Sequence, residues 1–255
     1  MSVIELKNIS KSYGQGSAKV DALKDVNFEA KEGEVVLIEG PSGAGKSTFL
    51  TIAGALQKPT SGEVFIGGKD VTNYSPKQAD ALRLDKIGFV LQAYNLVPYL
   101  TVKEQFILVD KVKKSGNMSK ERLDNLLNEL GIMQLINKYP KELSGGQQQR
   151  VGVARALAAD PSVTLFDEPF GAIDAITRSE LQEELLTIHK TYPNKTFVFI
   201  THDIYEAFKL GTRVMIMDEG KIAQFDTPEA ILKKPANDFV KRLLDTAKNQ
   251  ESLWG

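Results

Sequence analysis

The segment from Gly40 to Ser47 has the residue types and spacing of a loop that binds phosphate groups. It reads Gly-Pro-Ser-Gly-Ala-Gly-Lys-Ser and fits the pattern G-x-x-x-x-G-K-[ST] between an apolar strand and a helix expected over 49–56. The glycines let backbone N–H groups turn towards phosphate oxygens, and the helix N-terminus adds the positive end of its dipole. We therefore expect Lys46 to reach the β- and γ-phosphates of a nucleotide and the Ser47 hydroxyl to bind Mg²⁺. The phosphate-binding candidates are Gly40, Pro41, Ser42, Gly43, Ala44, Gly45, Lys46, Ser47 and Thr48.

Two carboxylates follow a second apolar strand, over 163–166. Asp167 is placed to hold Mg²⁺, and Glu168 is placed to polarise the attacking water in a phosphoryl transfer. Acidic pairs after strands are common, so this pair on its own does not distinguish a catalytic site from an ordinary strand end. Together with the phosphate-binding segment, it favours hydrolysis of a nucleotide.

A third segment follows Leu143 and consists of Ser144, Gly145, Gly146 and Gln147. It precedes a helix expected over 148–159, whose N-terminus would offer free N–H groups and a serine hydroxyl to an anion. An ordinary helix cap with two loop glycines is the alternative interpretation, and four residues alone do not decide between the two. The order of the three segments along the chain is more informative than any one of them.

The pattern of apolar residues predicts the elements that must carry these segments. Short apolar, β-branched runs predict strands buried on both faces of a parallel sheet, and helical patterns between them favour an α/β architecture. Residues 101–159 hold several helical patterns and no convincing strand, so we interpret them as a helical insertion. The predicted elements are buried strands over 35–38, 87–90, 163–166 and 196–200, further strands within 1–30 and after Gly220, and helices over 175–190, 228–234 and 236–247.

Composition excludes several other classes of protein. The 255 residues carry 32 Lys and Arg against 33 Asp and Glu, a net charge of -1, without the basic excess of a dedicated nucleic-acid binder. Cysteine is absent, which excludes disulfides and thiolate metal sites and favours a reducing cytosol. The longest apolar runs are far shorter than the roughly 20 residues that cross a bilayer, and the N-terminus does not have the pattern of a signal peptide.

The phosphate-binding segment, Leu143-Ser144-Gly145-Gly146-Gln147 and the strand ending in Asp167-Glu168 occur in an order that resembles the ATP-binding cassette family. These are the nucleotide-binding subunits of ABC transporters, and the resemblance spans roughly residues 2 to 234. It implies a single α/β domain of the P-loop NTPase class, with a RecA-like core, an antiparallel β subdomain and a helical insertion subdomain. The implied divisions are a catalytic core at 1–92 and 161–234, a helical subdomain at 93–160, and a C-terminal helix and tail at 235–255.

The resemblance also assigns roles to single residues. Tyr13 matches the aromatic residue that stacks on adenine, and Val20 would flank the same base. Gln92 matches the glutamine that touches Mg²⁺ and the lytic water, so the implied metal ligands are Ser47, Gln92 and Asp167. The implied catalytic residues are Glu168, Gln92 and His202, the last of which would contact the γ-phosphate.

Two further segments match parts of the family that meet other chains. Gly171-Ala172-Ile173-Asp174 matches the D-loop, which crosses the dimer interface, with Ile173 where leucine is commoner and Asp174 as the site residue. Residues 93–101 would face a membrane permease. The apolar and aromatic side chains of that segment suit a docking surface, although core packing of the insertion is the alternative; they are Tyr94, Leu96, Val97 and Tyr99.

The implied function is that of an ATPase with ATP and Mg²⁺ as cofactors. In the family, two cassettes close head to tail, and each ATP lies between one chain's phosphate-binding segment and the Ser-Gly-Gly segment of the other. The implied partners are a second copy of the chain and transmembrane permease subunits, with no nucleic acid. The chain would then be cytoplasmic and peripheral on the inner face of the cell membrane.

The two halves of the chain resemble different transporter groups. The segments at 19–26 and 88–98 resemble the lipoprotein-release and macrolide-export group, whereas those at 167–178 and 235–240 resemble osmoprotectant (quaternary amine) importers. We therefore hypothesise a mosaic joined near 143–150, which leaves the direction of transport open.

Two alternative functions belong to other classes. One is a soluble cassette ATPase acting on DNA or ribosomes, whose members usually carry a long coiled coil or two cassettes in one chain. The other is a P-loop kinase or phosphotransferase, which would have no use for residues 143–147. Co-purification with a membrane protein separates the transporter subunit from both.

Overall fold

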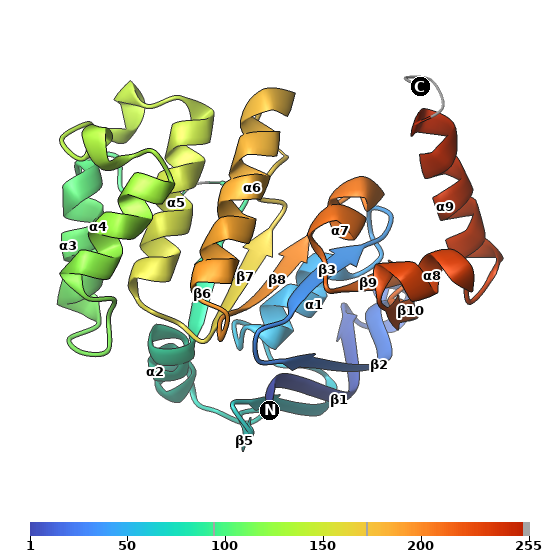
Figure 1. Cartoon of the computed structure of the whole chain (residues 1–255). Coiled ribbons are helices and arrows are strands. Elements are labelled where there is room, and N and C mark those ends of the chain that lie inside the picture. The colour runs from blue at the N-terminus through green and yellow to red at the C-terminus, as the bar shows by residue number, and fades with distance from the viewer. Residues whose placement is uncertain (94, 172, 252–255) are drawn as a thin grey trace. The chain divides into compact units, whose positions relative to one another are not determined.

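The computed structural model describes residues 1–93, 95–171 and 173–251, apart from the side chains of Ser17 and 247–251. The chain forms two compact units (Figure 1). The first unit comprises Met1–Ser75 and Thr196–Gly255, and the second comprises Pro76–Lys195. Two residues named in the sequence analysis, Tyr94 and Ala172, lie outside the described residues.

An antiparallel sheet in the first unit is built from the N-terminal strands in the order β2-β1-β4-β5. Apolar and polar residues alternate along β1 and β2, and the buried positions include Ile4, Leu6 and Phe28. This alternation is typical of a sheet that packs on the core with one face. The strands are β1 (Ser2–Tyr13), β2 (Val20–Lys31), β4 (Ser61–Ile66) and β5 (Lys69–Asp70), with the 3₁₀ turn η1 (Gly16–Ala18) between β1 and β2.

A second set of strands in the first unit runs in the order β10-β9-β3-β8. Strand β3 pairs in parallel with both β8 and β9, and β10 pairs antiparallel with β9. All five residues of β3 and of β8 are buried, as the predicted runs at 35–38 and 196–200 require. The strands are β3 (Val35–Glu39), β8 (Thr196–Ile200), β9 (Arg213–Asp218) and β10 (Lys221–Asp226).

Helix α1 packs against both sets of strands in the first unit, because it contacts β1, β2 and β8. Its Phe49 is fully buried and meets Phe28 edge to face, with ring centroids 4.9 Å apart. Aromatic pairs in this geometry add to the stabilisation from burial alone. The helices of the first unit are α1 (Lys46–Ala53), α7 (Ile204–Leu210), α8 (Pro228–Lys233) and α9 (Asp238–Glu251).

The second unit holds one parallel pair of strands and a group of helices. Strand β6 (Ile87–Val90) pairs in parallel with β7 (Val163–Asp167). Between them along the chain, α3, α4 and α5 lie side by side, as the predicted helical insertion requires (Figure 1). The helices are α2 (Pro76–Lys86), α3 (Val102–Val112), α4 (Lys120–Glu129), α5 (Gly145–Ala158) and α6 (Ala175–Thr191), with 3₁₀ turns η2 (Met133–Leu135) and η3 (Pro140–Glu142).

Two predicted helix starts were wrong by three residues. Helix α1 begins at Lys46 rather than at residue 49, and α5 begins at Gly145 rather than at residue 148. Each helix begins directly after its cap, Gly45 or Ser144, several residues before its first apolar side chain. The first helical turns therefore lie inside the segments that were singled out for their chemistry.

The structure also contains elements that the sequence analysis did not anticipate. Strand β9 carries four fully buried residues from Val214 to Met217 and lies between β3 and β10. Helices α2 and α7 and strands β4 and β5 were also missed. Within the described ranges, no helix combines the length and the apolar character that a bilayer crossing requires.

Candidate active site

The phosphate-binding segment of the first unit connects the end of β3 to the start of α1. Gly45, the N-cap of α1, has a φ of +96°, and a Cβ there would lie 2.4 Å from the carbonyl oxygen of Ala22. A Cβ at Gly40 would lie 2.3 Å from the carbonyl oxygen of Met217. Only glycine fits these two positions. Because Gly45 provides no side-chain cap, the first N–H groups of α1 are available to an anion.

Lys46 already points into this segment. Its Nζ donates hydrogen bonds to the carbonyl oxygens of Gly40 at 2.5 Å and Pro41 at 3.0 Å, and the side chain is buried. An ammonium group held against two carbonyl oxygens is placed to exchange them for phosphate oxygens. The loop is also held by the N–H of Ala44, which donates to the carbonyl of Pro41 at 3.1 Å. Of the remaining segment residues, Ser42, Gly43 and Ser47 are exposed and Thr48 is half-buried.

The two residues expected to flank the base lie side by side in the first unit. Tyr13 and Val20 are directly paired across β1 and β2, and both side chains are exposed. The Tyr13 hydroxyl donates to Oε1 of Gln57 at 2.7 Å and lies 3.5 Å from the hydroxyl oxygen of Thr48 in α1. The hydrogen bond fixes the aromatic ring beside the phosphate-binding segment.

His202 follows β8, the parallel neighbour of β3, and its side chain is exposed. The N–H of Thr201 donates to the carbonyl of Ile38 at 3.0 Å, so the end of β8 is tied to the end of β3. In parallel α/β sheets, ligands bind at the carboxyl ends of the strands. The first unit therefore places His202 and the phosphate-binding segment at the same ends of neighbouring strands.

Glu39 is a residue of this site that the sequence analysis missed. It is the last residue of β3, directly before Gly40, and its side chain is only 4% exposed. Burial raises the pKa of its carboxyl group to about 7, although Lys46 and a hydrogen bond from the Gly40 backbone oppose the shift. The signal in the sequence was a single carboxylate at the end of the apolar run that enters the phosphate-binding segment.

In the second unit, Asp167 ends β7 and Glu168 begins the turn that follows. Glu168 has a φ of +46°, in the left-handed region that non-glycine residues rarely adopt and that is enriched at functional sites. The N–H of Gly171 donates to the carbonyl of Glu168 at 3.1 Å and closes the turn. A Cβ at Gly171 would lie 3.7 Å from Oε2 of Glu168 and 3.8 Å from Nε2 of Gln92. The structure therefore brings Glu168 and Gln92 together against one glycine.

Ser144 is the N-cap of α5 and forms a capping box with Gln147. The N–H of Gln147 donates to the Ser144 hydroxyl oxygen at 3.2 Å, and the N–H of Ser144 donates to Oε1 of Gln147 at 3.0 Å. The helix-cap interpretation is therefore correct as a description of structure. It does not exclude anion binding, because Ser144 is exposed and its hydroxyl oxygen is used as an acceptor, which leaves its proton to donate.

Gly146 and Asp174 belong to two helix starts that pack together. A Cβ at Gly146 would lie 2.4 Å from Cγ2 of Thr177, so α5 and α6 approach each other closely at this point. Asp174 is the N-cap of α6 and accepts from the N–H groups of Ile176 at 3.1 Å and Thr177 at 3.0 Å. The hydrogen bond from the Thr177 backbone lowers the pKa of Asp174. The segment at 144–147 and the predicted D-loop are thus neighbours in the second unit, and Thr177 is a contact residue that the sequence analysis missed.

The segment expected to face a permease is held on the second unit by two polar side chains. Gln105 is fully buried and its Nε2 donates to the carbonyls of Val97 at 2.8 Å and Leu100 at 3.2 Å. Arg155 donates to the carbonyl of Asn95 at 2.9 Å. Tyr99 is 76% exposed, and Leu96 and Val97 are half-buried. Core packing therefore does not explain Tyr99.

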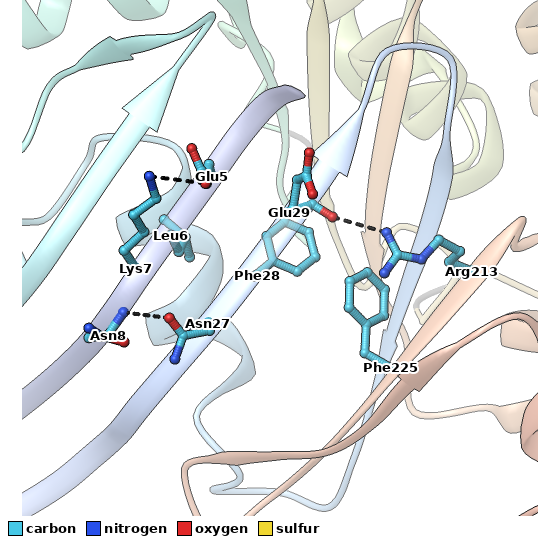
Figure 2. A pocket seen from close by; sticks show the side chains of 9 residues that line it. All are labelled: Glu5, Leu6, Lys7, Asn8, Asn27, Phe28, Glu29, Arg213 and Phe225. Carbon is cyan, nitrogen blue, oxygen red and sulfur yellow. Dashed lines mark hydrogen bonds and ion pairs between the residues drawn. The ribbon is translucent and has the colours of Figure 1, made fainter. Parts of the chain in front are cut away.

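A hollow of about 510 Å³ on the first unit is separate from these residues (Figure 2). Its nine lining residues include none of the predicted site residues. Phe28 and Phe225 stack there with ring centroids 5.2 Å apart, and the Arg213 guanidinium lies 3.6 Å from the centroid of Phe225. Arg213 also donates to the carbonyl of Glu29 at 3.1 Å. These groups are engaged with one another, and the hollow shares no lining residue with the predicted nucleotide site.

The predicted metal ligands have the right donor chemistry for Mg²⁺. A hydroxyl, an amide and a carboxylate at Ser47, Gln92 and Asp167 are oxygen donors, which this hard cation prefers. Among the described residues, no group of three or more His, Cys, Asp or Glu side chains could hold a metal ion.

A family model described as "ABC transporter" matches residues 23–171, which include the phosphate-binding segment, residues 143–147 and Asp167. This chain belongs to the ABC transporter family. The order of the three segments therefore predicted the correct family. The chain also has the P-loop NTPase fold that the order of these segments implied. We refer to the chain below as the cassette.

Curated relatives cover nearly the whole cassette. The carnitine transport ATP-binding protein OpuCA of Listeria monocytogenes is 43% identical over 241 residues, which are 94% of this chain and 59% of the relative. The glycine betaine uptake system ATP-binding protein YehX of Escherichia coli is 40% identical, over 94% of this chain and 76% of the relative. The cassette spans only about three-fifths of the length of the first of these relatives.

Two solved structures of similar proteins are dimers. A dimeric ABC transporter cassette is 41% identical with a TM-score of 0.79, covering 88% of this chain and 98% of that one. A dimeric cassette in a post-hydrolysis state, bound to ADP and Pi, is also 41% identical, with a TM-score of 0.78.

Proposed function

We propose that the cassette binds and hydrolyses ATP as the energy-coupling subunit of a membrane transporter. The observation that carries this proposal is the phosphate-binding segment itself, in which Lys46 is held against the carbonyl oxygens of Gly40 and Pro41 at the N-terminus of α1. The similarity to a cassette bound to ADP and Pi supports a nucleotide as the ligand.

Each site residue has a separate role in the proposed hydrolysis. Lys46 and the N–H groups at the start of α1 bind the β- and γ-phosphates, and Tyr13 and Val20 hold the base. Glu168 orients a water molecule for attack on the γ-phosphorus and accepts its proton, while the bond to the β–γ bridging oxygen breaks and ADP leaves. Gln92 orients the same water.

The remaining site residues would complete this arrangement. His202 would contact the γ-phosphate, and Ser47, Gln92 and Asp167 would hold Mg²⁺. When bound, that ion neutralises charge that develops on the phosphate oxygens.

We propose two kinds of partner. Two cassettes would close head to tail around ATP, so that the segment at 144–147 of one chain completes the phosphate site of the other. Dimeric structures of similar cassettes and the exposed cap at Ser144 support this arrangement. Permease subunits on the inner face of the membrane would contact residues 93–101, where Tyr99 is largely exposed.

The names of the relatives favour a small osmoprotectant as the cargo and import as the direction of transport. The relatives named for transport of carnitine, choline or osmoprotectants match 93–95% of this chain, so both halves are included. A sulfate/thiosulfate import ATP-binding protein is also 42% identical, although its cargo is different. The proposed cargo therefore concerns the permease more than the cassette. The mosaic origin is a separate proposal, and comparing residues 1–142 and 151–255 separately with both transporter groups tests it.

The test of the proposed function is ATP binding and phosphate release with Lys46→Ala. Removing the ammonium group eliminates charge-assisted hydrogen bonds to the phosphates, so we expect ATP affinity roughly 10–100-fold weaker and hydrolysis lost. Lys69→Ala changes an exposed lysine of the same unit in β5 and should behave as the parent chain. Unchanged affinity in Lys46→Ala would refute the assignment. Co-purification of the cassette with DNA or ribosomes instead of a membrane protein would favour the alternative class.

A further inference from the structure

The end of β3 carries a buried carboxyl group whose environment is unusual. Glu39 is only 4% exposed and follows four residues that are all apolar and buried, Val35 to Ile38. Its neighbour across the parallel strand β9 is Ile216, which is also apolar and fully buried. Water is therefore excluded from this side chain on the sheet side, and an ionised carboxylate is disfavoured there.

The hydrogen bonding of Glu39 is incomplete. The Gly40 backbone contributes one hydrogen bond to the carboxyl group, but Oε2 has no hydrogen-bond partner in the described part of the chain. A buried carboxylate normally has several donors or a directly paired cation, and one without them changes its protonation instead of staying charged. The effect of burial exceeds that of the neighbouring cation, which is why the pKa of Glu39 lies at about 7.

Two charged groups act on Glu39. Lys46 on α1 favours the ionised carboxylate, and Asp203 at the start of α7 disfavours it. On the β8 side, Thr201 is neutral and its hydroxyl is engaged with Glu206. The protonation of Glu39 therefore depends on the charge of the phosphate-binding segment, which carries Lys46.

We propose that Glu39 is a positioning residue that acts through Lys46 and couples nucleotide binding to the uptake of a proton. The proposal rests on the proposed function, because the ligand is a nucleotide on the phosphate-binding segment. Two effects of the ligand act in the same direction. The polyphosphate adds negative charge beside Glu39, and it turns the Lys46 ammonium from the loop carbonyls towards phosphate oxygens, which removes part of the compensation that ionised Glu39 received.

The consequence for affinity follows from linkage. If nucleotide binding raises the proton affinity of Glu39 by some factor, then protonation of Glu39 must raise the nucleotide affinity by the same factor. Below pH about 7 the carboxyl is neutral in the free chain and binding takes up no proton. Between pH about 7 and the higher pKa of the nucleotide-bound form, Glu39 is ionised only in the free chain, so binding takes up a proton and affinity falls as the pH rises, by at most about tenfold per pH unit.

The test is calorimetric titration of the full chain with ADP in saturating Mg²⁺. ADP lacks the γ-phosphate, so the contact expected of His202 does not contribute. Titrations at about pH 6.5, 7.5 and 8.5, in two buffers with different ionisation enthalpies, measure both the dissociation constant and the number of protons taken up. For the parent chain we expect uptake of a fraction of a proton at about pH 7.5 and weakening of at least several-fold between the lowest and highest pH.

Glu39→Gln keeps the shape of the side chain and cannot ionise. This variant should bind ADP with nearly the same affinity at all three pH values and show no buffer-dependent heat from proton uptake. Glu34→Gln is the matched control, since Glu34 lies just before β3 and is engaged with the Lys31 backbone and Arg213. It should retain the pH dependence of the parent chain. Glu39→Met provides the same test with an apolar side chain if the amide variant does not fold.

The outcomes separate this inference from the proposed function. Proton uptake that persists unchanged in Glu39→Gln would overturn the role of Glu39, even if nucleotide binding is intact. Equal ADP affinity at all pH values in the parent chain would overturn it as well. Absence of ADP binding at every pH would instead refute the proposed function, and with it the ligand on which this inference depends.

Discussion

Glu168, the residue that we propose as the general base, adopts an unfavourable backbone conformation. Its φ of +46° is rarely adopted by residues with a side chain, and the turn is held by the hydrogen bond from Gly171. Conformations of this kind cost of order 1–3 kcal/mol and persist only where the surrounding structure imposes them. The conformation aims the carboxylate towards the position of Gly171, where the amide of Gln92 also lies.

Replacement of Glu168 by glutamine tests the base directly. The amide cannot accept a proton from water, so hydrolysis should slow by roughly 10²-fold or more. ATP affinity should be kept, because the substitution leaves the proposed phosphate contacts of Lys46 and the start of α1 unchanged. Phosphate release and ATP binding measured on the same sample check both expectations. Glu183→Gln, an exposed carboxylate on α6, should hydrolyse ATP at the parent rate. A parent rate in Glu168→Gln would show that another group is the base.

At the level of elements, the start of α5 is defined by its contact with the start of α6. Gly146 lies in the first turn of α5, where a Cβ would meet Cγ2 of Thr177 at 2.4 Å. Arg150 joins the same two helices further along, with ion pairs to Glu180 at 3.0 Å and Glu184 at 2.9 Å. The helices that follow the anion-binding candidate Ser144 and the cap Asp174 are therefore joined at two places along their length.

Gly146→Ala should destabilise the cassette although alanine is the better helix former. The gain from helix propensity is at most about 1 kcal/mol, whereas overpacking against Thr177 costs about 1–3 kcal/mol. Thr177→Ser removes Cγ2 alone, so the double variant should recover most of the lost stability. Urea unfolding of Gly146→Ala, Thr177→Ser and the double variant measures this. Additive effects of the two substitutions would show that the helices do not meet at this contact.

At the level of the whole molecule, the proposed phosphate site needs a second chain. Slow hydrolysis in Glu168→Gln and the removal of one negative charge beside ATP should both favour the closed dimer. With ATP and Mg²⁺, size-exclusion chromatography of this variant should show a shift from about 28.1 kDa to twice that mass. Adding Ser144→Arg places a bulky side chain in the partner's phosphate site and should restore the monomer while ATP binding stays. A dimer that persists in the double variant would contradict the head-to-tail arrangement.

The sequence by itself determined the family, the fold class and the strands that carry the site. These follow from local information, because phosphate binding requires glycines, a lysine and a hydroxyl at fixed spacing between a strand and a helix. Strands buried on both faces are visible as continuous apolar runs, as in β3 and β8. The helical character of residues 102–158 was equally readable. The starts of α1 and α5 were not readable in the same way. Each helix begins directly after its cap and before its first apolar residue.

Only the tertiary structure decided which side chains lose contact with water and which helices meet. Nothing near Glu39 in the sequence shows that β9 pairs beside it or that its side chain is buried, and burial is what moves its pKa to about 7. Thr177 is an ordinary residue of α6 until packing places its methyl group against Gly146, 31 positions earlier in the chain. Both effects depend on contacts between residues far apart in sequence, and periodicity and spacing report only on residues that are close together.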